Sequence, residues 1–205
     1  MSFQQFIAGF LGAGAIEILA SISGFLCIYL LIKRSIWSWF FGFIQVSLYT
    51  YIFYIAKLYS DTGLHIIYMF LQVYGWWNWK HNKSEGNDLV IENGSLFSFL
   101  ICWGVVLLAT VVLGFTMDEY TDASFAYPDA FTTTASLVAQ FLLSKRYWFN
   151  WIFWIIVDVV AVYIYLQKGL YPTAALYFTL LIMCFFGLYA WLTQSKTQNL
   201  ESAKA

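Results

Sequence analysis

Long hydrophobic runs separated by short polar breaks occupy most of the chain. A transmembrane helix needs about 20 mostly apolar residues, whereas the strands of a transmembrane barrel are segments of about 10 residues that alternate in polarity. The runs in this chain are continuous, so the pattern predicts an all-α membrane protein with seven transmembrane helices. The predicted helices span residues 14–32, 36–56, 62–80, 95–117, 129–144, 147–167 and 170–192. The polar tail, residues 193–205, is predicted to be frayed.

The composition agrees with a protein whose surroundings are lipid. Of the 205 residues, 61% are hydrophobic and only 10% are charged. An average soluble domain is about 45–50% apolar and about 25% charged. The net charge of −1 provides no basic surface for phosphates, so no nucleic-acid partner is expected. The composition therefore implies the lipid bilayer as a partner.

Residue patterns typical of cofactor, metal and catalytic sites do not occur in the sequence. Cys27, Cys102 and Cys184 lie inside apolar runs without CxxC spacing, which makes them small buried hydrophobic residues. His65 and His81 have no cluster of acidic residues or histidines beside them. Neither a P-loop nor the glycine pattern of dinucleotide-binding folds is present. We therefore expect no metal, no cofactor and no enzymatic activity.

The positive charges predict the orientation of the helices. Helices alternate in direction, so the loops after the first, third and fifth helices share one side of the membrane with the C-terminus. That side carries eight of the ten Lys and Arg residues, namely Lys33, Arg34, Lys80, Lys83, Lys145, Arg146, Lys196 and Lys204. The other side carries only Lys57 and Lys168. Because cytoplasmic loops are rich in Lys and Arg, the N-terminus is predicted outside and the tail, residues 193–205, in the cytoplasm.

The chain contains an internal repeat. When it is shifted by 112 residues, Lys33-Arg34 falls on Lys145-Arg146 without a gap. Further identities in this register are Trp39 with Trp151, Tyr51 with Tyr163, Gly75 with Gly187, and Trp79 with Trp191. The alternative is chance matching in a biased composition. The repeat predicts three-helix units at residues 14–80 and 129–192 joined by a linker helix at residues 95–117, the 3+1+3 parallel-repeat bundle of SWEET-type transporters.

One predicted helix carries a face suited to binding a small molecule. Polar groups inside lipid are unfavourable and usually face the bundle interior, and parallel-repeat transporters bind substrate between the repeats near the midplane. In the helix at residues 147–167, Asn150, Trp154 and Asp158 recur every four residues and share one face. An amide, an indole and a carboxylate in this order suit a small, polar, aromatic ligand. The alternative is that Asn150 and Asp158 join helices and Trp154 lies at the membrane interface.

The helix at residues 129–144 supplies a second polar face. Thr132, Ser136 and Gln140 recur every four residues there. Gln140 is long and hard to hide in lipid, so it is a candidate for substrate binding. The alternative for Thr132 and Ser136 is that their hydroxyls bond to the preceding turn of the same helix.

The helix at residues 62–80 adds Gln72 in its middle and Trp76 on the same face. Trp76 lies near the predicted cytoplasmic end, where interfacial aromatic residues are common. In the repeat register Asn150 corresponds to Ser38, and Trp154 to Gly42. The predicted site between the repeats is therefore asymmetric and is drawn mainly from the second repeat.

Several stretches resemble the PnuC family of bacterial nicotinamide riboside transporters. These are DAFTTTASLVAQFLL, KRYWFNWIFWIIVDV, QKGLYPTAALY and QVYGWWNW, and the resemblance extends over essentially the whole chain. It implies facilitated uptake of nicotinamide riboside, an NAD precursor, across the inner membrane, with phosphorylation inside the cell trapping the substrate. Related members carry thiamine or riboflavin, so another vitamin is the alternative substrate. The resemblance also suggests a homo-oligomer, namely a trimer.

The resemblance assigns substrate contact to Asn150 and Trp154. Trp148-Phe149 stands where the family pattern has Trp-Glu, so no role of an acidic residue is carried over to that position.

The chemistry of nicotinamide riboside fits the candidate residues. Its pyridinium cation can lie over the ring of Trp154, an interaction worth about 0.5–2 kcal/mol. Asn150, Gln72 and Gln140 can bond the carboxamide and the ribose hydroxyls, and Asp158 can offset the positive charge. The rival class is a proton-coupled carrier of another small solute. No proline interrupts the middle of a predicted helix, so rigid-body rocking of the repeats is the expected opening motion.

Overall fold

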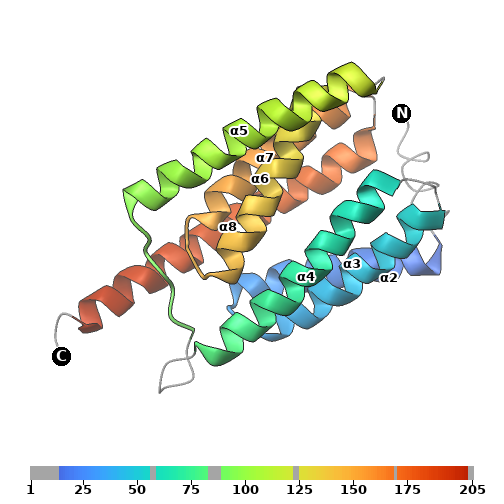
Figure 1. The fold of residues 1–205 in the computed structure, drawn as a ribbon. Helices are drawn as coiled ribbons and strands as arrows, with labels where there is room; N and C mark the ends of the chain where they lie inside the picture. Colours follow the sequence, from blue (N-terminus) through green and yellow to red (C-terminus); the bar gives the residue numbers. More distant parts are fainter. Residues whose placement is uncertain (1–13, 56–58, 83–88, 122–124, 169, 203–205) are drawn as a thin grey trace. The chain divides into compact units, whose positions relative to one another are not determined.

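The computed structural model describes residues 14–55, 59–82, 89–121, 125–168 and 170–202. This part of the chain is almost entirely helical (Figure 1). Its helices are α2 (Ala15–Ile32), α3 (Trp37–Ile55), α4 (Tyr59–His81), α5 (Leu96–Tyr120), α6 (Ala126–Ser144), α7 (Asn150–Gln167) and α8 (Tyr171–Ser202). The predicted all-α class and the positions of the predicted helices are confirmed, because each apolar run forms one helix. Lys57, Lys83 and Lys204, used in the orientation argument, lie outside the described residues.

Five of the helices are long and apolar enough to cross a membrane: α2, α3, α5, α7 and the Thr173–Leu200 part of α8. The remaining two helices of the described chain, α4 and α6, are more polar. They carry many of the candidate substrate-binding residues, such as Gln72 on α4 and Gln140 on α6. The polar residues predicted to bind substrate therefore contribute to the lower hydropathy of α4 and α6.

The chain divides into two compact units. Unit 1 holds α2 to α4, and unit 2 begins at Val90 and holds α5 to α8. In unit 1, α3 packs against both α2 and α4. In unit 2, α7 packs against both α6 and α8, as α3 does against α2 and α4. In addition, α5 packs against α6. The predicted linker helix, α5, is thus in contact with α6.

The two basic pairs end their helices in the same backbone conformation. Arg34 and Arg146 have φ of +56° and +69°, values that are unusual for residues other than glycine. The N–H of Arg34 donates to Leu31 O at 2.9 Å, and that of Arg146 to Leu143 O at 3.0 Å. The next N–H in each case donates to the carbonyl five residues earlier, which completes a Schellman motif. The repeated sequence therefore forms a repeated turn.

Each unit also contains the same aromatic packing arrangement. Two tryptophan rings meet edge to face, and a glycine leaves room for the first of them. The residues are Trp39, Gly75 and Trp79 in unit 1 and Trp151, Gly187 and Trp191 in unit 2. The ring centroids are 5.2 Å and 5.7 Å apart, with interplanar angles of 86° and 84°. The members of the two triplets are related by the same shift of 112 residues, which agrees with the predicted repeat.

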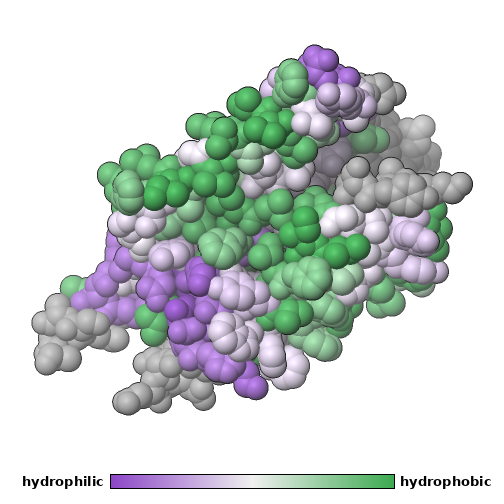
Figure 2. All heavy atoms as spheres, in the orientation of Figure 1, coloured by the Kyte–Doolittle hydropathy of each residue, from purple (hydrophilic) through white to green (hydrophobic). Residues whose placement is uncertain are grey.

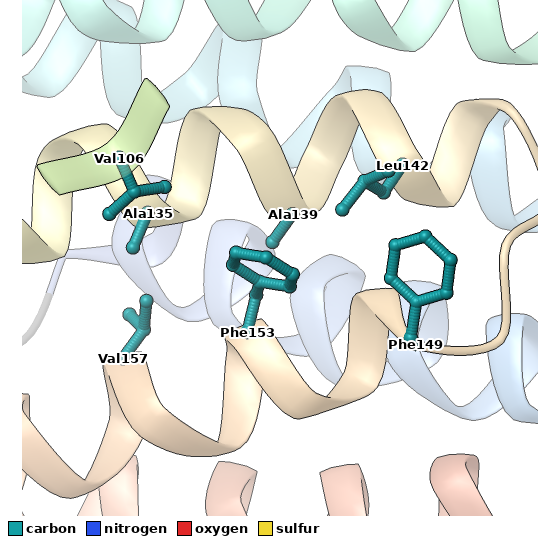
Figure 3. Close-up of a cluster of buried hydrophobic side chains, with 7 residues drawn as sticks. All are labelled: Val106, Ala135, Ala139, Leu142, Phe149, Phe153 and Val157. Atoms are coloured by element: carbon teal, nitrogen blue, oxygen red, sulfur yellow. The ribbon is translucent and has the colours of Figure 1, made fainter. Parts of the chain in front are cut away.

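A cluster of buried apolar residues joins α5, α6 and α7 in unit 2. Figure 3 shows the side chains of α7 pointing at small or branched residues of α6, with Phe153 facing Ala139 and Val157 facing Ala135. Alanines on α6 let the aromatic rings of α7 approach its backbone closely. The members of the cluster are Val106, Ala135, Ala139, Leu142, Phe149, Phe153 and Val157.

The outer side of α5 is hydrophobic over most of its length. Figure 2 shows hydrophobic residues on much of the visible side of this helix, with hydrophilic residues at its end. They include Leu100, Leu107, Leu108, Val111 and Val112, each of which is exposed. A soluble protein rarely exposes an apolar surface of this extent, whereas lipid accepts it without penalty.

The C-terminal tail differs from the prediction. Residues 194–202 are not frayed, because α8 continues as a helix to Ser202. At 1.5 Å per residue its 32 residues span roughly 48 Å, more than the hydrocarbon core of a bilayer. Ser195 in this extension is buried and donates a hydrogen bond to Asn93 Oδ1. Contacts to a segment distant in the sequence, which hydropathy does not show, keep these polar turns ordered.

Candidate functional site

The first turn of α7 holds a buried amide with an unused acceptor. Asn150 is fully buried, and its Nδ2 donates to the carbonyl of Tyr147 at 2.7 Å. Its Oδ1 is also buried but has no hydrogen-bond partner. A buried acceptor without a partner is unfavourable by about 1–3 kcal/mol, so such a group calls for an explanation. A ligand that offers an N–H or O–H donor would satisfy it.

Trp154 lies one turn further along α7 and is half-buried. It packs against the cluster formed by α5, α6 and α7. This contact fixes the ring at the edge of the apolar core while part of its surface stays accessible. The indole therefore meets the requirement for a stacking surface, namely a rigid ring with accessible area.

Asp158 lies a turn beyond Trp154 and is only 3% exposed. Its Oδ2 accepts a hydrogen bond from the thiol of Cys184 on α8 at 3.3 Å. A thiol is a weak donor, and Asp158 forms no ion pair within the described residues. The carboxylate is thus buried against α8 without a countercharge from this part of the chain.

The polar face of α6 is largely satisfied by its own backbone. Thr132 Oγ1 donates to Asp129 O at 2.9 Å, and Ser136 Oγ donates to Thr133 O at 3.0 Å. Both hydroxyls thus bond to the preceding turn of their own helix, which was the alternative to substrate binding. Gln140, one turn beyond Ser136, is buried, and its longer side chain is the strongest remaining candidate on α6.

In unit 1, Gln72 is buried against the neighbouring helix. A Cβ added to Gly42 of α3 would lie 2.5 Å from Gln72 Nε2, so the glycine makes room for the amide. Gln72 Oε1 is a second buried acceptor without a hydrogen-bond partner. Trp76 is 43% exposed, and the ammonium of Lys80 lies 5.0 Å from its ring centroid. Trp76 is therefore already paired with a cation.

The candidate residues fall into two groups. Unit 2 brings six of them onto two helices that pack together: Thr132, Ser136 and Gln140 on α6, and Asn150, Trp154 and Asp158 on α7. Gln72 and Trp76 belong to unit 1, and their share in a common site stays a prediction.

Two structural features of this region were not predicted from the sequence. Cys184 is the partner of Asp158, although its position in an apolar run gave no sign of it. Thr110 of α5 and Thr134 of α6 share a hydrogen bond of 2.8 Å, which ties α5 to the candidate helices. The repeat register links Asn150 to a residue of similar character in unit 1. Ser38, at the corresponding position, is likewise fully buried, and its side-chain oxygen has no hydrogen-bond partner.

The described residues contain no group of three or more His, Cys, Asp or Glu side chains that could hold a metal ion. The binding groups in these residues are amides, hydroxyls, indoles and one buried carboxylate. Such a set can recognise an organic molecule by hydrogen bonds, stacking and charge.

Comparisons with known proteins agree on one family. The family model described as the nicotinamide mononucleotide transporter matches residues 14–193. The nicotinamide riboside transporter PnuC of Escherichia coli (strain K12) is 26% identical over 219 aligned positions, which cover 92% of each chain. The PnuC protein of Neisseria mucosa is 28% identical over 70% of this chain and 56% of its own. The riboflavin/roseoflavin transporter RibM of Streptomyces davaonensis is 23% identical over 92% of this chain and 91% of its own.

The fold has a counterpart among solved structures. The crystal structure of the vitamin B3 transporter PnuC superposes with a TM-score of 0.73 at 23% identity, covering 95% of this chain and 87% of that one. The PnuC resemblance of the sequence motifs is thus confirmed. The family match spans nearly the whole described chain, and the protein, a multi-pass membrane protein, belongs to the nicotinamide mononucleotide transporter family.

Proposed function

We propose that the chain carries nicotinamide riboside across the bacterial inner membrane by facilitated diffusion. The observation that carries the proposal is the series of groups along α7. Asn150 offers a buried acceptor without a partner, Trp154 offers a half-buried ring, and Asp158 offers a buried carboxylate without a cation in the described chain. A carboxamide and a pyridinium cation supply the matching donor, face and charge. The names of the E. coli and N. mucosa relatives support the same substrate.

Equilibrium binding tests the substrate. Purified protein is titrated with nicotinamide riboside, thiamine and riboflavin side by side by isothermal calorimetry. We expect nicotinamide riboside to bind in the micromolar range or tighter and the other two ligands to bind more weakly. The similarity to RibM makes riboflavin the second candidate, and tighter binding of riboflavin would favour it. If none of the three ligands binds, the proposed function is wrong.

Within the spans of the described chain, Asp158 is the one acidic side chain that lies deep. A proton relay needs a series of titratable groups, so we propose facilitated diffusion. In proteoliposomes, labelled nicotinamide riboside is expected to equilibrate without a proton gradient. It should accumulate only when a kinase and ATP are enclosed to phosphorylate it. If a protonophore abolishes accumulation while the kinase is absent, the rival proton-coupled carrier is favoured.

We further propose the parallel 3+1+3 arrangement, with units at residues 14–80 and 129–192, the linker helix at residues 95–117, the N-terminus outside and the C-terminus in the cytoplasm. The repeated turns at Arg34 and Arg146 support it. Single cysteines introduced as Lys33→Cys and Lys168→Cys in a cysteine-free background test the orientation. An impermeant maleimide applied to intact cells should label position 168 and not position 33, and the reverse pattern would contradict the orientation.

The PnuC resemblance also supports a homo-oligomer, which we propose to be a trimer. The lipid-facing character of α5 leaves extensive apolar surface for such contacts. Light scattering of the purified protein in detergent measures the mass of the assembly, and a monomeric mass would contradict the trimer.

A further inference from the structure

A short segment before α5 pairs with the loop between α6 and α7 in unit 2. We call this segment, residues 91–94, the clasp (Figure 1). The N–H of Glu92 donates to Arg146 O at 2.9 Å, and the N–H of Trp148 donates to Glu92 O at 3.4 Å. Glu92 and Tyr147 thereby form an isolated parallel β-bridge. The loop that leads into α7 is therefore held by backbone hydrogen bonds on both sides of Tyr147.

An ion pair reinforces this bridge. Arg146 Nη2 lies 3.1 Å from Glu92 Oε1, with the two side chains 10% and 45% exposed. Burial lowers the pKa of the Arg146 guanidinium, whereas the negative charge of Glu92 raises it, and the group stays protonated. Burying a cation is unfavourable without a countercharge, and Glu92 supplies a countercharge to Arg146 in this loop.

The clasp is also bound by the final turns of α8. Ile91 N–H donates to Gln198 Oε1 at 3.0 Å, and Asn93 Nδ2 donates to Asn199 Oδ1 at 3.1 Å. Ser195 Oγ donates to Asn93 Oδ1. The clasp thus lies between the loop and the end of α8, which explains why α8 stays helical beyond the length of a membrane span.

Gly94 ends the clasp at a point of close approach. It has φ of +64°, and an added Cβ would overlap the ring of Phe149 and lie 3.1 Å from Cδ1 of Tyr147. Those two rings stack on each other with centroids 5.1 Å apart. Only glycine fits both the backbone conformation and the space.

The clasp acts on a residue of the candidate site through one carbonyl group. The carbonyl of Tyr147, at the centre of the bridge, accepts both the backbone N–H of Asn150 at 3.1 Å and its side-chain Nδ2 at 2.7 Å. The side-chain bond fixes the direction in which Asn150 Oδ1 points. Unit 1 has the same turn at Arg34, but Arg34 forms no ion pair within the described residues. The reinforcement is therefore specific to the unit that carries the asparagine.

We infer that the clasp is a positioning element for substrate binding: it fixes the carbonyl of Tyr147 and thereby aims the amide of Asn150 at the ligand. This inference rests on the proposed function. Glu92, Gly94 and Arg146 act through Asn150 and do not themselves touch the substrate. The chain thus uses the first residues of unit 2, which precede α5, to set the geometry of one end of α7.

The test compares affinities for nicotinamide riboside by calorimetry. Glu92→Ala removes the ion pair and is expected to weaken binding at least about threefold, a loss of the size expected from a partly exposed pair. Gly94→Ala should have an effect in the same direction. Lys168→Ala is the matched control, because it breaks a different ion pair of unit 2, Asp129–Lys168, at 3.3 Å. The control is expected to bind as the unaltered protein does.

A double-mutant cycle separates positioning from simple destabilisation. Asn150→Ser introduces the residue that unit 1 has at the matching position, and it removes the amide that the clasp aims. In the Asn150→Ser background, Glu92→Ala is expected to have no further effect on the dissociation constant. Additive losses, or a Glu92→Ala protein that binds normally, would overturn the inference. The double variant Glu92→Arg with Arg146→Glu, in which the pair is reversed, is expected to restore affinity.

The outcomes distinguish this inference from the proposed function. If the unaltered protein does not bind nicotinamide riboside, or Asn150→Ser binds it as well as the unaltered protein, the proposed function of α7 is wrong. If Asn150→Ser weakens binding but Glu92→Ala and Gly94→Ala do not, only the clasp inference is wrong. Circular dichroism and thermal unfolding of each variant show whether the helices are intact.

Discussion

The thiol of Cys184 donates a hydrogen bond of 3.3 Å to the carboxylate of Asp158 across the buried contact of α7 and α8. The pair joins two helices, which is the structural explanation for a buried aspartate. The hydrogen bond does not neutralise the carboxylate, which has no ion-pair partner within the described residues. A cationic substrate that supplies the missing positive charge is the second explanation. Substitutions at the two positions separate these explanations.

Asp158→Asn is expected to weaken the binding of nicotinamide riboside about tenfold or more, because it removes the negative charge that offsets the pyridinium, and 1.4 kcal/mol corresponds to a factor of ten. Cys184→Ala removes only a weak donor and should leave the dissociation constant within about threefold. Calorimetric titration of both variants provides the measurement. Equal affinity of Asp158→Asn and the unaltered protein would mean that Asp158 only joins α7 to α8.

Trp154→Ala is expected to weaken binding by a factor between about 2 and 30, the range that corresponds to the loss of about 0.5–2 kcal/mol of cation–π interaction. Trp77→Ala is the matched control, because Trp77 is exposed in unit 1 and its ring lies against those of His81 and Tyr74 of its own helix. Calorimetry gives the affinities, and circular dichroism checks that the helical content is unchanged. If both substitutions have the same effect, Trp154 is not the stacking surface.

The sequence was sufficient for the helices because most predicted spans are long, continuous apolar runs, and helices satisfy all their backbone hydrogen bonds within lipid. It also placed Lys33-Arg34 and Lys145-Arg146 at equivalent breaks 112 positions apart, and the structure adds that Arg34 and Arg146 share a backbone conformation. The order of Asn150, Trp154 and Asp158 along one helix followed from helical periodicity alone.

The features missed from the sequence depend on contacts between distant residues. The segment around Glu92 has no alternating pattern, so only its pairing with Tyr147 makes it strand-like. The helical form of the polar end of α8 depends on Asn93, about 100 positions earlier, and hydropathy cannot express that dependence. Likewise, no local pattern shows that the carboxylate of Asp158 meets Cys184.

Gly187→Ala is expected to lower the stability of the protein by about 1–3 kcal/mol, because the added Cβ would lie 2.6 Å from ring carbons of the buried Trp151. Gly104→Ala is the matched control on α5, where nothing lies within 4 Å of the added atom. That substitution should stabilise the helix by about 0.5–1 kcal/mol. Thermal unfolding in detergent measures both. Equal shifts in Tm would contradict the close approach of α8 to Trp151.

Replacing the two arginines by glycine is expected to have opposite consequences. Both have positive φ, a conformation that costs roughly 1–2 kcal/mol for residues other than glycine. Arg34→Gly relieves this strain and loses no ion pair of the described chain, so Tm should stay unchanged or rise slightly. Arg146→Gly relieves the same strain but leaves Glu92 without its partner, so Tm should fall. The difference in Tm between the two variants measures the contribution of the Arg146–Glu92 ion pair to stability, because the two turns have the same backbone conformation. If Tm changes equally in both, the ion pair adds nothing to the stability of unit 2.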